Sequence, residues 1–312
     1  MSTNEERREA AKRKLEERLE RERQEARRRK IIIASVSTVV VVAIVATAAT
    51  LITKKILDDR EAARWTACAY EDAPSKFDQV PKTVPDGVPA DQKAQMQAYY
   101  DSIRANADKQ RTSPKPGDKQ LKEGTEALVF QTNQGTIPIT LDRASAPCNA
   151  GAVISLAQNG YYNNTPCHRM TNAETLKVLQ CGDPTGTGVG GPGWSSPDEP
   201  PVGFKPAGQA DPMSGGSAPV IYPKGTVAIA NSNNPQSGQS NTGSAQFFLV
   251  MQDSQLAPNY SVVGKVDPEG LTVLDKIGKN GLNPGPTGDP NDGTPKQPVE
   301  ITTATVGGGN QD

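Results

Sequence analysis

Residues 125–142, TEALVFQTNQGTIPITLD, decide how the second half of this chain folds. Two runs rich in β-branched and other apolar residues, at 126–132 and 136–142, flank the connection NQG at 133–135. A short, glycine-containing connection between two such runs is typical of a β-hairpin. We therefore predict that the folded region begins with two antiparallel strands.

The chain beyond this hairpin contains more short apolar runs but only two clear helical patterns. One helix is predicted from Pro147, which suits a first helical turn, to a stop at Gly160, and a second from Pro268 to Gly278. Many short strands with few helices favour a β-barrel or sandwich with helical plugs over a parallel α/β sheet. The further predicted strands lie at 225–231, 245–251, 260–266 and 299–306.

Composition and charge exclude several classes of function. The chain has 312 residues, a net charge of −1, 29 Gly and 26 Pro, so a fair part of it is loop, linker or tail. Residues 1–30 hold twelve Lys and Arg against eight Glu, so the basic residues gather in a tail and nucleic-acid binding is not expected. One histidine, His168, excludes multi-histidine metal sites, and the four cysteines lack Cys-x-x-Cys spacing. We expect no metal and no cofactor.

A glycine-rich run contains one competing motif. Gly186, Gly188 and Gly191 have the G-x-G-x-x-G spacing of a dinucleotide-binding loop. Such a loop must open a helix whose N-terminus holds the pyrophosphate, but Pro192 and Pro197 follow here. Nucleotide binding is therefore not predicted.

Residues 31–53, IIIASVSTVVVVAIVATAATLIT, carry no charge. As a helix they would extend about 33 Å, enough to cross a hydrocarbon core of about 30 Å. The alternative is a cleaved signal peptide, but the run is longer than the roughly 7 to 15 apolar residues of such a segment. We expect a transmembrane helix.

The charges beside this helix predict its orientation. Residues 27–30 are all basic, whereas residues 54–61 mix both signs. By the positive-inside rule the N-terminus stays in the cytoplasm and residues 54–312 lie outside, which makes this a single-pass protein of the cell membrane. The charged cytoplasmic tail, residues 1–30, is interpreted as a solvated helix that sets the topology, with a lipid-headgroup or coiled-coil contact as the alternative.

Residues 54–124 form the predicted connection between membrane and folded domain. A proline-rich piece at 81–90 and a short helical pattern at 91–110 are typical of an extracytoplasmic stalk. The alternative, that this segment belongs to the folded domain, rests on Trp65, Cys68 and Tyr70, which are unusual in a free linker. The folded domain is then expected over residues 125–306, followed by a tail at 307–312.

Five motifs occur in order within the predicted domain. They are Cys167-His168-Arg169, VLQCGDPTGTGVGGPGW at 178–194, IANSNN at 229–234, GSAQFFLVM at 243–251 and LAPNYSVVGKV at 256–266. In order and spacing these motifs resemble the cyclophilin-type peptidyl-prolyl isomerases over roughly residues 125–306, and the chain looks most like the actinobacterial branch of that family. The resemblance implies a mainly β fold, a closed eight-stranded antiparallel barrel capped by two helices.

The resemblance also implies a catalytic site. Arg169 would donate a hydrogen bond to the imide nitrogen of a bound proline in the twisted transition state, Gln180 would hold the guanidinium and the peptide, and Phe248 would form a wall of the proline pocket. His168 is interpreted as structural, because rotation about an imide bond requires no proton transfer. The implied substrate-binding residues are Asn231, Ala230, Val178, Leu256, Tyr260 and Gln246.

Two positions depart from the family pattern. Lys177 stands three residues before Gln180, where an aromatic residue is usual, so either Leu176 replaces that wall or the proline pocket is weakened. Gln255 stands where cyclosporin-sensitive members carry tryptophan, so weak binding of cyclosporin is expected.

All four cysteines lie on the side predicted to be outside, where disulfides persist. The resemblance places Cys167 and Cys181 on neighbouring strands, which would leave Cys68 to pair with Cys148. Four cysteines allow three connectivities, and the sequence alone does not choose among them.

The function implied is that of a peptidyl-prolyl cis-trans isomerase that assists folding of secreted or cell-envelope proteins. Its partners would be proline-containing unfolded or extended polypeptides, and residues 31–53 would bind the membrane. A catalytically weak module that binds proline-containing segments as chaperone or scaffold is the main alternative, and a purely structural anchor is a third.

Overall fold

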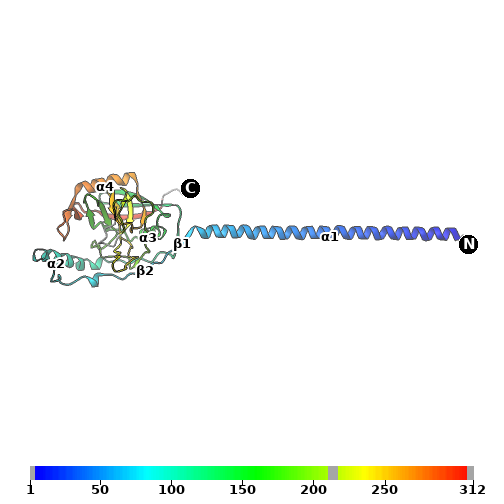
Figure 1. The fold of residues 1–312 in the computed structure, drawn as a ribbon, viewed down its shortest axis with the longest axis horizontal. Coiled ribbons are helices and arrows are strands. Elements are labelled where there is room, and N and C mark those ends of the chain that lie inside the picture. The colour runs from blue at the N-terminus through cyan, green and yellow to red at the C-terminus, as the bar shows by residue number, and fades with distance from the viewer. Residues whose placement is uncertain (1–3, 210–216, 308–312) are drawn as a thin grey trace. The chain divides into compact units, whose positions relative to one another are not determined.

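The computed structural model describes residues 4–209 and 217–307 (Figure 1). Its contacts divide the chain into two compact units, with the boundary between Ala63 and Arg64. Of the expected C-terminal tail, residues 308–312 lie outside the described part.

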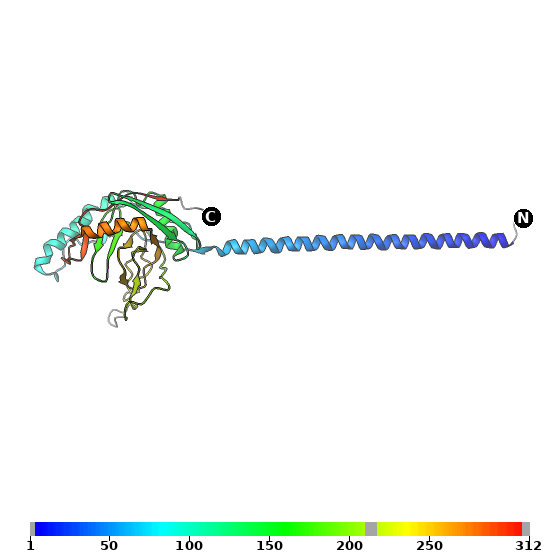
Figure 2. The same cartoon turned by 90° about the horizontal axis from the view of Figure 1, so that it is seen from above.

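The first unit contains one uninterrupted helix, α1 (Asn4–Ala63), which Figure 2 shows along its length. It joins the expected charged tail and the expected apolar span in a single element. In the charged part, Glu9 pairs with Arg13 and Glu22 with Arg18, one helical turn apart. By length and composition α1 is able to cross a membrane, a property that signal sequences share.

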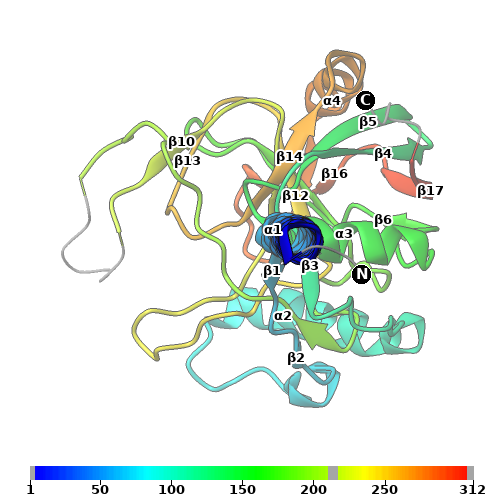
Figure 3. The same cartoon turned by 90° about the vertical axis from the view of Figure 1, so that its right-hand side faces the viewer.

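The second unit is built around one curled antiparallel sheet of eleven strands (Figure 3). The hairpin predicted at 125–142 lies near one edge of this sheet, paired in register from Thr125 with Asp142 to Thr132 with Gly135. The mainly β fold is confirmed. In spatial order the strands are β15 (Leu282–Pro284), β16 (Asp292–Pro295), β7 (Arg169–Thr171), β8 (Val178–Cys181), β12 (Phe247–Val250), β11 (Thr226–Ile229), β14 (Val262–Val266), β5 (Gly135–Asp142), β4 (Thr125–Thr132), β17 (Glu300–Val306) and β6 (Thr165–Pro166).

The sheet differs from the closed eight-stranded barrel that was expected. Its hydrogen-bonded order ends at β15 and β6, so it is an open half-barrel. Two strands are added by the β15–β16 hairpin, and one more arises because the segment around residues 165–171 is divided into β6 and β7. The Cys167 N–H still donates to the Val299 carbonyl beside β17, whereas Arg169 already pairs with Gln180 on β8, so the segment changes partner between these two residues.

Two helices pack against the sheet. The helix α3 (Pro147–Gln158) begins at the predicted proline and is buried along most of its length, and α4 (Pro268–Asn280) packs against β5. The predicted start of each helix is confirmed. Gly281, with φ of 78°, follows α4 and adopts the left-handed conformation that favours glycine after a helix.

A cluster of aromatic side chains lies within the core beneath the sheet. The rings of Phe130 and Phe247 stack with centroids 5.1 Å apart, and Tyr162 meets both edge-on. The Tyr162 hydroxyl donates a hydrogen bond to the Ala245 carbonyl, which satisfies its one buried polar group. Because Phe130 lies on β4 and Phe247 on β12, their stacked rings hold these two strands together.

Residues 64–124 belong to the second unit, so the expected stalk is divided: residues 54–63 complete α1 and the remainder is folded with the sheet. The Tyr70 hydroxyl donates to the Cys148 carbonyl at 2.7 Å, and the Tyr70 ring packs on Trp194. Cys68 is buried and Tyr70 is half-buried within the domain, whereas Trp65 is 38% exposed. Its elements are β1 (Trp65–Ala67), β2 (Glu71–Asp72), η1 (Phe77–Gln79), α2 (Ala90–Ala105), η2 (Ala107–Lys109) and β3 (Lys119–Leu121). β1 pairs with β3 and β2 with β9 (Trp194–Ser195), while β10 (Val220–Tyr222) pairs with β13 (Ser254–Leu256).

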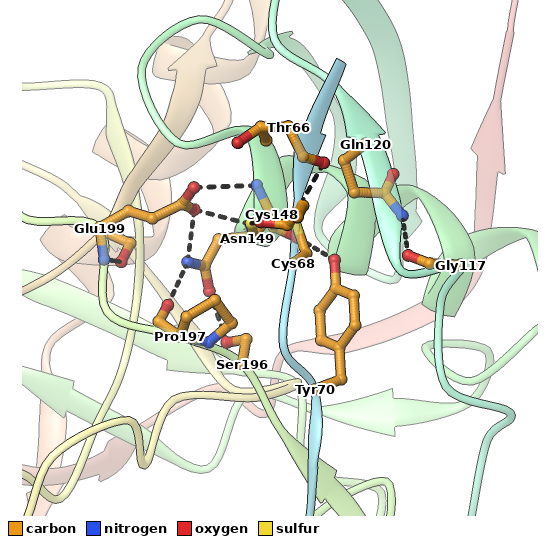
Figure 4. The surroundings of a disulfide bond; sticks show 12 residues. Thr66, Cys68, Tyr70, Gly117, Gln120, Cys148, Asn149, Ser196, Pro197 and Glu199 are labelled. Carbon is orange, nitrogen blue, oxygen red and sulfur yellow. Dashed lines mark hydrogen bonds between the residues drawn. A yellow bond between two sulfur atoms is a disulfide. The ribbon is translucent and has the colours of Figure 1, made fainter.

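Two disulfides form, Cys167 with Cys181 and Cys68 with Cys148, which is the pairing the resemblance implied. Figure 4 shows the second of these at the start of α3. There the Glu199 carboxylate accepts the backbone N–H groups of Cys148 and Asn149 at 3.0 and 2.9 Å. A carboxylate at a helix N-terminus satisfies free N–H groups and complements the helix dipole.

Replacing Cys68 and Cys148 together by serine is expected to destabilise the second unit. The cysteines are 80 residues apart, and closing a loop of that length contributes about 4 to 5 kcal/mol in the chain-entropy model. Urea unfolding followed by tryptophan fluorescence measures the loss, with the reduced wild-type protein as a control. An unchanged unfolding midpoint would contradict the predicted contribution.

Candidate functional site

The strand register brings three predicted catalytic residues into one row. Arg169 on β7 lies directly opposite Gln180 on β8, and Gln180 lies directly opposite Phe248 on β12. Directly opposite residues on antiparallel strands share a face of the sheet, so the three side chains project from the same side.

This row borders a cavity of about 220 Å³. All residues predicted by resemblance to line the groove are present except Gln246, which lines the neighbouring cavity. The structure also brings in Leu176. The lining residues are Arg169, Leu176, Val178, Gln180, Ala230, Asn231, Phe248, Leu256 and Tyr260.

Leu176 lines this cavity, whereas Lys177 does not. Leu176 lines the cavity beside Val178 and packs against the apolar cluster that includes Phe248. Lys177 lines a different cavity, of about 330 Å³, next to α4. The aliphatic Leu176 side chain therefore supplies apolar surface to this cavity.

The apolar side of the cavity is formed by Phe248 and Tyr260. Phe248 is 5% exposed, and its ring meets that of Tyr260 edge-on with centroids 5.3 Å apart. Burial raises the pKa of Tyr260, while the nearby Arg169 charge lowers it. The Tyr260 hydroxyl therefore stays protonated at neutral pH and is able to donate a hydrogen bond.

The polar side of the cavity is a chain of side-chain hydrogen bonds. The Arg169 Nη1 group donates to Gln180 Oε1 at 3.3 Å, and Gln180 Nε2 donates to Gln246 Oε1 at 3.0 Å. Gln246 Nε2 then donates to the carbonyls of Gly188 and Gly190 at 2.9 and 3.0 Å. Each amide is oriented by its neighbour, so the chain fixes Gln180 in the position where it accepts from the guanidinium.

Arg169 has a further partner that the sequence interpretation missed. Asp292 on β16 accepts from Arg169 Nε at 2.9 Å and from Nη2 at 2.7 Å. The hydrogen bond to Asp292 is the main reason why the pKa of Arg169 is raised, and burial opposes it. Residues 278–298 are rich in Gly, Pro and Asp, a composition typical of loops, so the sequence held no signal for this contact.

Asn231 links the two loops that border the cavity. Its side-chain amide donates to the Asn259 carbonyl at 2.8 Å, and its oxygen accepts the Asn233 N–H at 3.3 Å. Its role in substrate binding stays a prediction.

A second cavity, of about 510 Å³, adjoins the first. The two share Gln180, Ala230 and Asn231. Residues 71–76 line the second cavity on one side, although they precede the rest of its wall by more than a hundred residues. Sequence reasoning placed them in the stalk and therefore missed them.

The glycine-rich run is organised by a buried carboxylate. Asp183 accepts the backbone N–H groups of Thr185, Thr187, Gly188 and Gly190 at distances of 2.7 to 3.2 Å. Gly188 has φ of 79°, a conformation that favours glycine. The run leads into the strand β9. Its carbonyls are thereby held where Gln246 donates to them.

His168 lies outside both cavities. Its Nε2 atom faces Gly188, and among the described residues neither ring nitrogen has a hydrogen-bond partner. Burial is the main reason why the pKa of His168 is lowered. The Asp183 charge raises this pKa by a smaller amount, and the Arg169 charge lowers it further. The ring is therefore neutral at pH 7.

The sequence of this chain also matches a known protein family. The family model described as "Cyclophilin type peptidyl-prolyl cis-trans isomerase/CLD" matches residues 127–306. The chain therefore belongs to the cyclophilin family of peptidyl-prolyl cis-trans isomerases.

Its relatives include two mycobacterial proteins, in agreement with the expected actinobacterial branch. The "Probable peptidyl-prolyl cis-trans isomerase B" of Mycobacterium tuberculosis (strain ATCC 25618 / H37Rv) is 41% identical over 193 residues, which cover 62% of this chain and 58% of that protein. The protein of the same name from Mycobacterium leprae (strain TN) is 43% identical over 188 residues, covering 60% and 59%. The chain thus spans less than two thirds of the length of these relatives.

Among solved structures, a cyclophilin-type isomerase of Cryptosporidium parvum matches with a TM-score of 0.43 and 22% identity. The match covers 60% of this chain and 100% of that one.

The stability of the second unit is expected to fall as the pH drops below about 6.5. Because burial lowers the His168 pKa in the folded state, the unfolded chain takes up this proton first, and stability decreases by at most about 1.4 kcal/mol per pH unit. The contribution is fully present above about pH 6.5. Urea unfolding between about pH 5 and pH 7.5 measures the slope.

His168→Gln is the matched variant, because the chain has one histidine and glutamine does not titrate. The wild-type slope in this pH range should exceed that of the variant. Equal slopes would mean that His168 is not the titrating group.

Proposed function

We propose that this chain is a peptidyl-prolyl cis-trans isomerase that accelerates rotation about X-Pro bonds in extended polypeptides. The observation that supports it is the row of Arg169, Gln180 and Phe248 around one cavity, in a chain of the cyclophilin family. Rotation about an imide bond breaks no covalent bond, so neither a nucleophile nor a cofactor is required.

The chemistry depends on the imide nitrogen. Partial double-bond character gives the X-Pro bond a rotation barrier of about 18–20 kcal/mol. In the twisted state this conjugation is lost and the nitrogen gains a lone pair. A hydrogen bond from the Arg169 guanidinium to that lone pair exists only in the transition state, so it lowers the barrier instead of merely strengthening binding.

The apolar wall contributes in a second way. Leu176, Val178, Phe248 and Leu256 would contact the prolyl ring and exclude water from it. Hydrogen bonds are stronger in a site of low dielectric constant, so the donor on Arg169 gains strength when the proline is bound.

The polar residues would hold the peptide on either side of the proline. Gln180 lines both cavities and donates a hydrogen bond to Gln246, which lines the second cavity, and Asn231 and Ala230 line both. A substrate extended along this groove would bind with its proline beside Phe248 and its preceding residues toward Gln246.

We also propose where the protein acts. The apolar part of α1, residues 31–53, would anchor the chain in the cell membrane, with residues 1–30 in the cytoplasm and the folded domain outside. Two disulfides agree with an oxidising compartment. The substrates would then be proline-containing, unfolded secreted or cell-envelope proteins.

A binding module of low catalytic activity, acting as chaperone or scaffold, is the second candidate. It is favoured by the aliphatic Leu176 in a wall that is usually aromatic, because a smaller side chain contacts the prolyl ring over less area. Such a module would bind prolyl peptides without accelerating their isomerisation.

Arg169→Ala should lower kcat/KM for isomerisation of an Ala-Pro-containing peptide by two to three decades, since a preorganised donor contributes about 2.7–4 kcal/mol. Lys265→Ala, which removes an exposed cation from β14 outside the groove, is the control and should keep wild-type activity. Equal rates for Arg169→Ala and wild type, with retained peptide binding, would favour the binding module.

Cyclosporin is expected to bind weakly. Gln255 is exposed on β13, next to the groove residue Leu256, at the position where sensitive relatives carry tryptophan. Gln255→Trp should raise the affinity by about 10- to 100-fold, as burial of one large apolar side chain contributes about 1.5–3 kcal/mol. Isothermal titration measures both affinities, and tight binding to the wild type would overturn the prediction.

A further inference from the structure

We propose that Asp292 is a positioning residue for Arg169, and that the β15–β16 hairpin holds Asp292 in place. The inference rests on the proposed isomerase function and adds a residue to its machinery. Asp292 does not line the cavity, so it would act through the guanidinium and not on the substrate.

The contact between the two side chains is bidentate. Both carboxylate oxygens of Asp292 are used, one by Nε at 2.9 Å and the other by Nη2 at 2.7 Å. Parallel hydrogen bonds of this kind fix the plane of the guanidinium as well as its distance. A single-point contact with a lysine would fix neither.

The pair contributes little to stability, because both side chains are partly exposed, Arg169 by 43% and Asp292 by 34%. The pair therefore acts mainly by fixing the position of the Arg169 guanidinium. An arginine side chain has several rotatable bonds, and without a partner its head samples many positions around the mouth of the cavity.

Counting donors shows what the pair leaves for the substrate. A guanidinium has five N–H donors. Asp292 takes one from Nε and one from Nη2, and Gln180 takes one from Nη1. One N–H on each terminal nitrogen is left, and the two anchors together decide the direction in which those donors point.

The backbone that carries Asp292 is itself held on both sides. Its carbonyl accepts the Gly285 N–H at 2.9 Å within the hairpin, and Asp292 stands opposite Thr171 in the pairing of β16 with β7. The next residue must be glycine, since a Cβ on Gly293 would collide with the Asn283 carbonyl. The carboxylate therefore starts from a fixed point two residues along the strand from Arg169.

The helix α2 supports the hairpin from the outside. Gln95 Nε2 donates to the Gly285 carbonyl at 3.1 Å, at the residue that holds the Asp292 backbone. Tyr99 lies one turn further along α2; burial raises its pKa, and the Arg169 charge lowers it. The segment between the membrane helix and the sheet thus contributes to the rigidity of the site.

The test compares Asp292→Asn, Asp292→Glu and wild type in the full chain purified in detergent. Exchange between the cis and trans forms of an Ala-Pro-containing peptide, measured by NMR, gives kcat and KM. Asparagine keeps the size but offers one acceptor and no charge, so kcat should fall about 10- to 100-fold while KM changes less than about two-fold. Asp292→Glu should recover part of the loss.

Two comparisons separate positioning from a general structural effect. In the Arg169→Ala background, Asp292→Asn should cause no further loss, because the residue acts only through the guanidinium. Asp289→Asn is the matched control: Asp289 lies in the same hairpin and accepts the Asn291 N–H, a role that asparagine retains. Its activity should equal that of wild type.

The inference is overturned if Asp292→Asn matches or exceeds the wild-type rate, which would make the pair neutral or inhibitory, or if the losses add in the double variant. An inactive wild-type protein would instead refute the proposed function. In that case the NMR signal of the Arg169 Nε–H group still decides the geometry: it should shift on Asp292→Asn and not on Asp289→Asn, and an unshifted signal contradicts the positioning role.

Discussion

The register between β7, β8 and β12 is the constraint on which the site depends. It aligns Arg169, Gln180 and Phe248 across three strands, and their side chains share a face because each pair is directly opposite. A slip of one residue in β8 would turn Gln180 to the other face and break the chain of amides. The buried aromatic core below β12 opposes such a slip, and the disulfide between Cys167 and Cys181 ties the segment before β7 to the end of β8.

Three groups of contacts hold the side chains of the site in place. The buried Asp183 carboxylate holds the glycine-rich run, whose carbonyls orient Gln246 and through it Gln180. The β15–β16 hairpin holds Asp292 against the opposite side of the guanidinium. Segment 64–121 packs against both, through β2 beside β9 and through Gln95 on α2. For a reaction in which no covalent bond changes, such preorganisation is the main means of lowering the barrier.

Local patterns predicted local structure well and long-range contacts poorly. The hairpin at 125–142 and the starts of α3 and α4 follow from turn glycines, helix-starting prolines and apolar runs, which act over a few residues. The cavity residues followed only from the family resemblance. Asp292 and residues 71–76 were missed because each meets the site from more than a hundred residues away in sequence, within segments whose Pro, Gly and Asp content is typical of loops. The eleven-stranded sheet likewise reflects the β15–β16 hairpin and the division of segment 165–171 into β6 and β7, which no periodicity marks.

The ion pair between Arg169 and Asp292 also bears on how the site would recognise a peptide. A bare guanidinium would attract carboxylates of any passing peptide, but the bidentate contact with Asp292 compensates the charge of Arg169 while leaving two of its N–H donors unused. The arginine then acts through the direction of its donors more than through a long-range field. Recognition would depend on the prolyl ring in the apolar wall and on backbone hydrogen bonds, both of which are common to all proline-containing chains. A site of this kind would suit the proposed isomerase function on unfolded polypeptides of varied sequence.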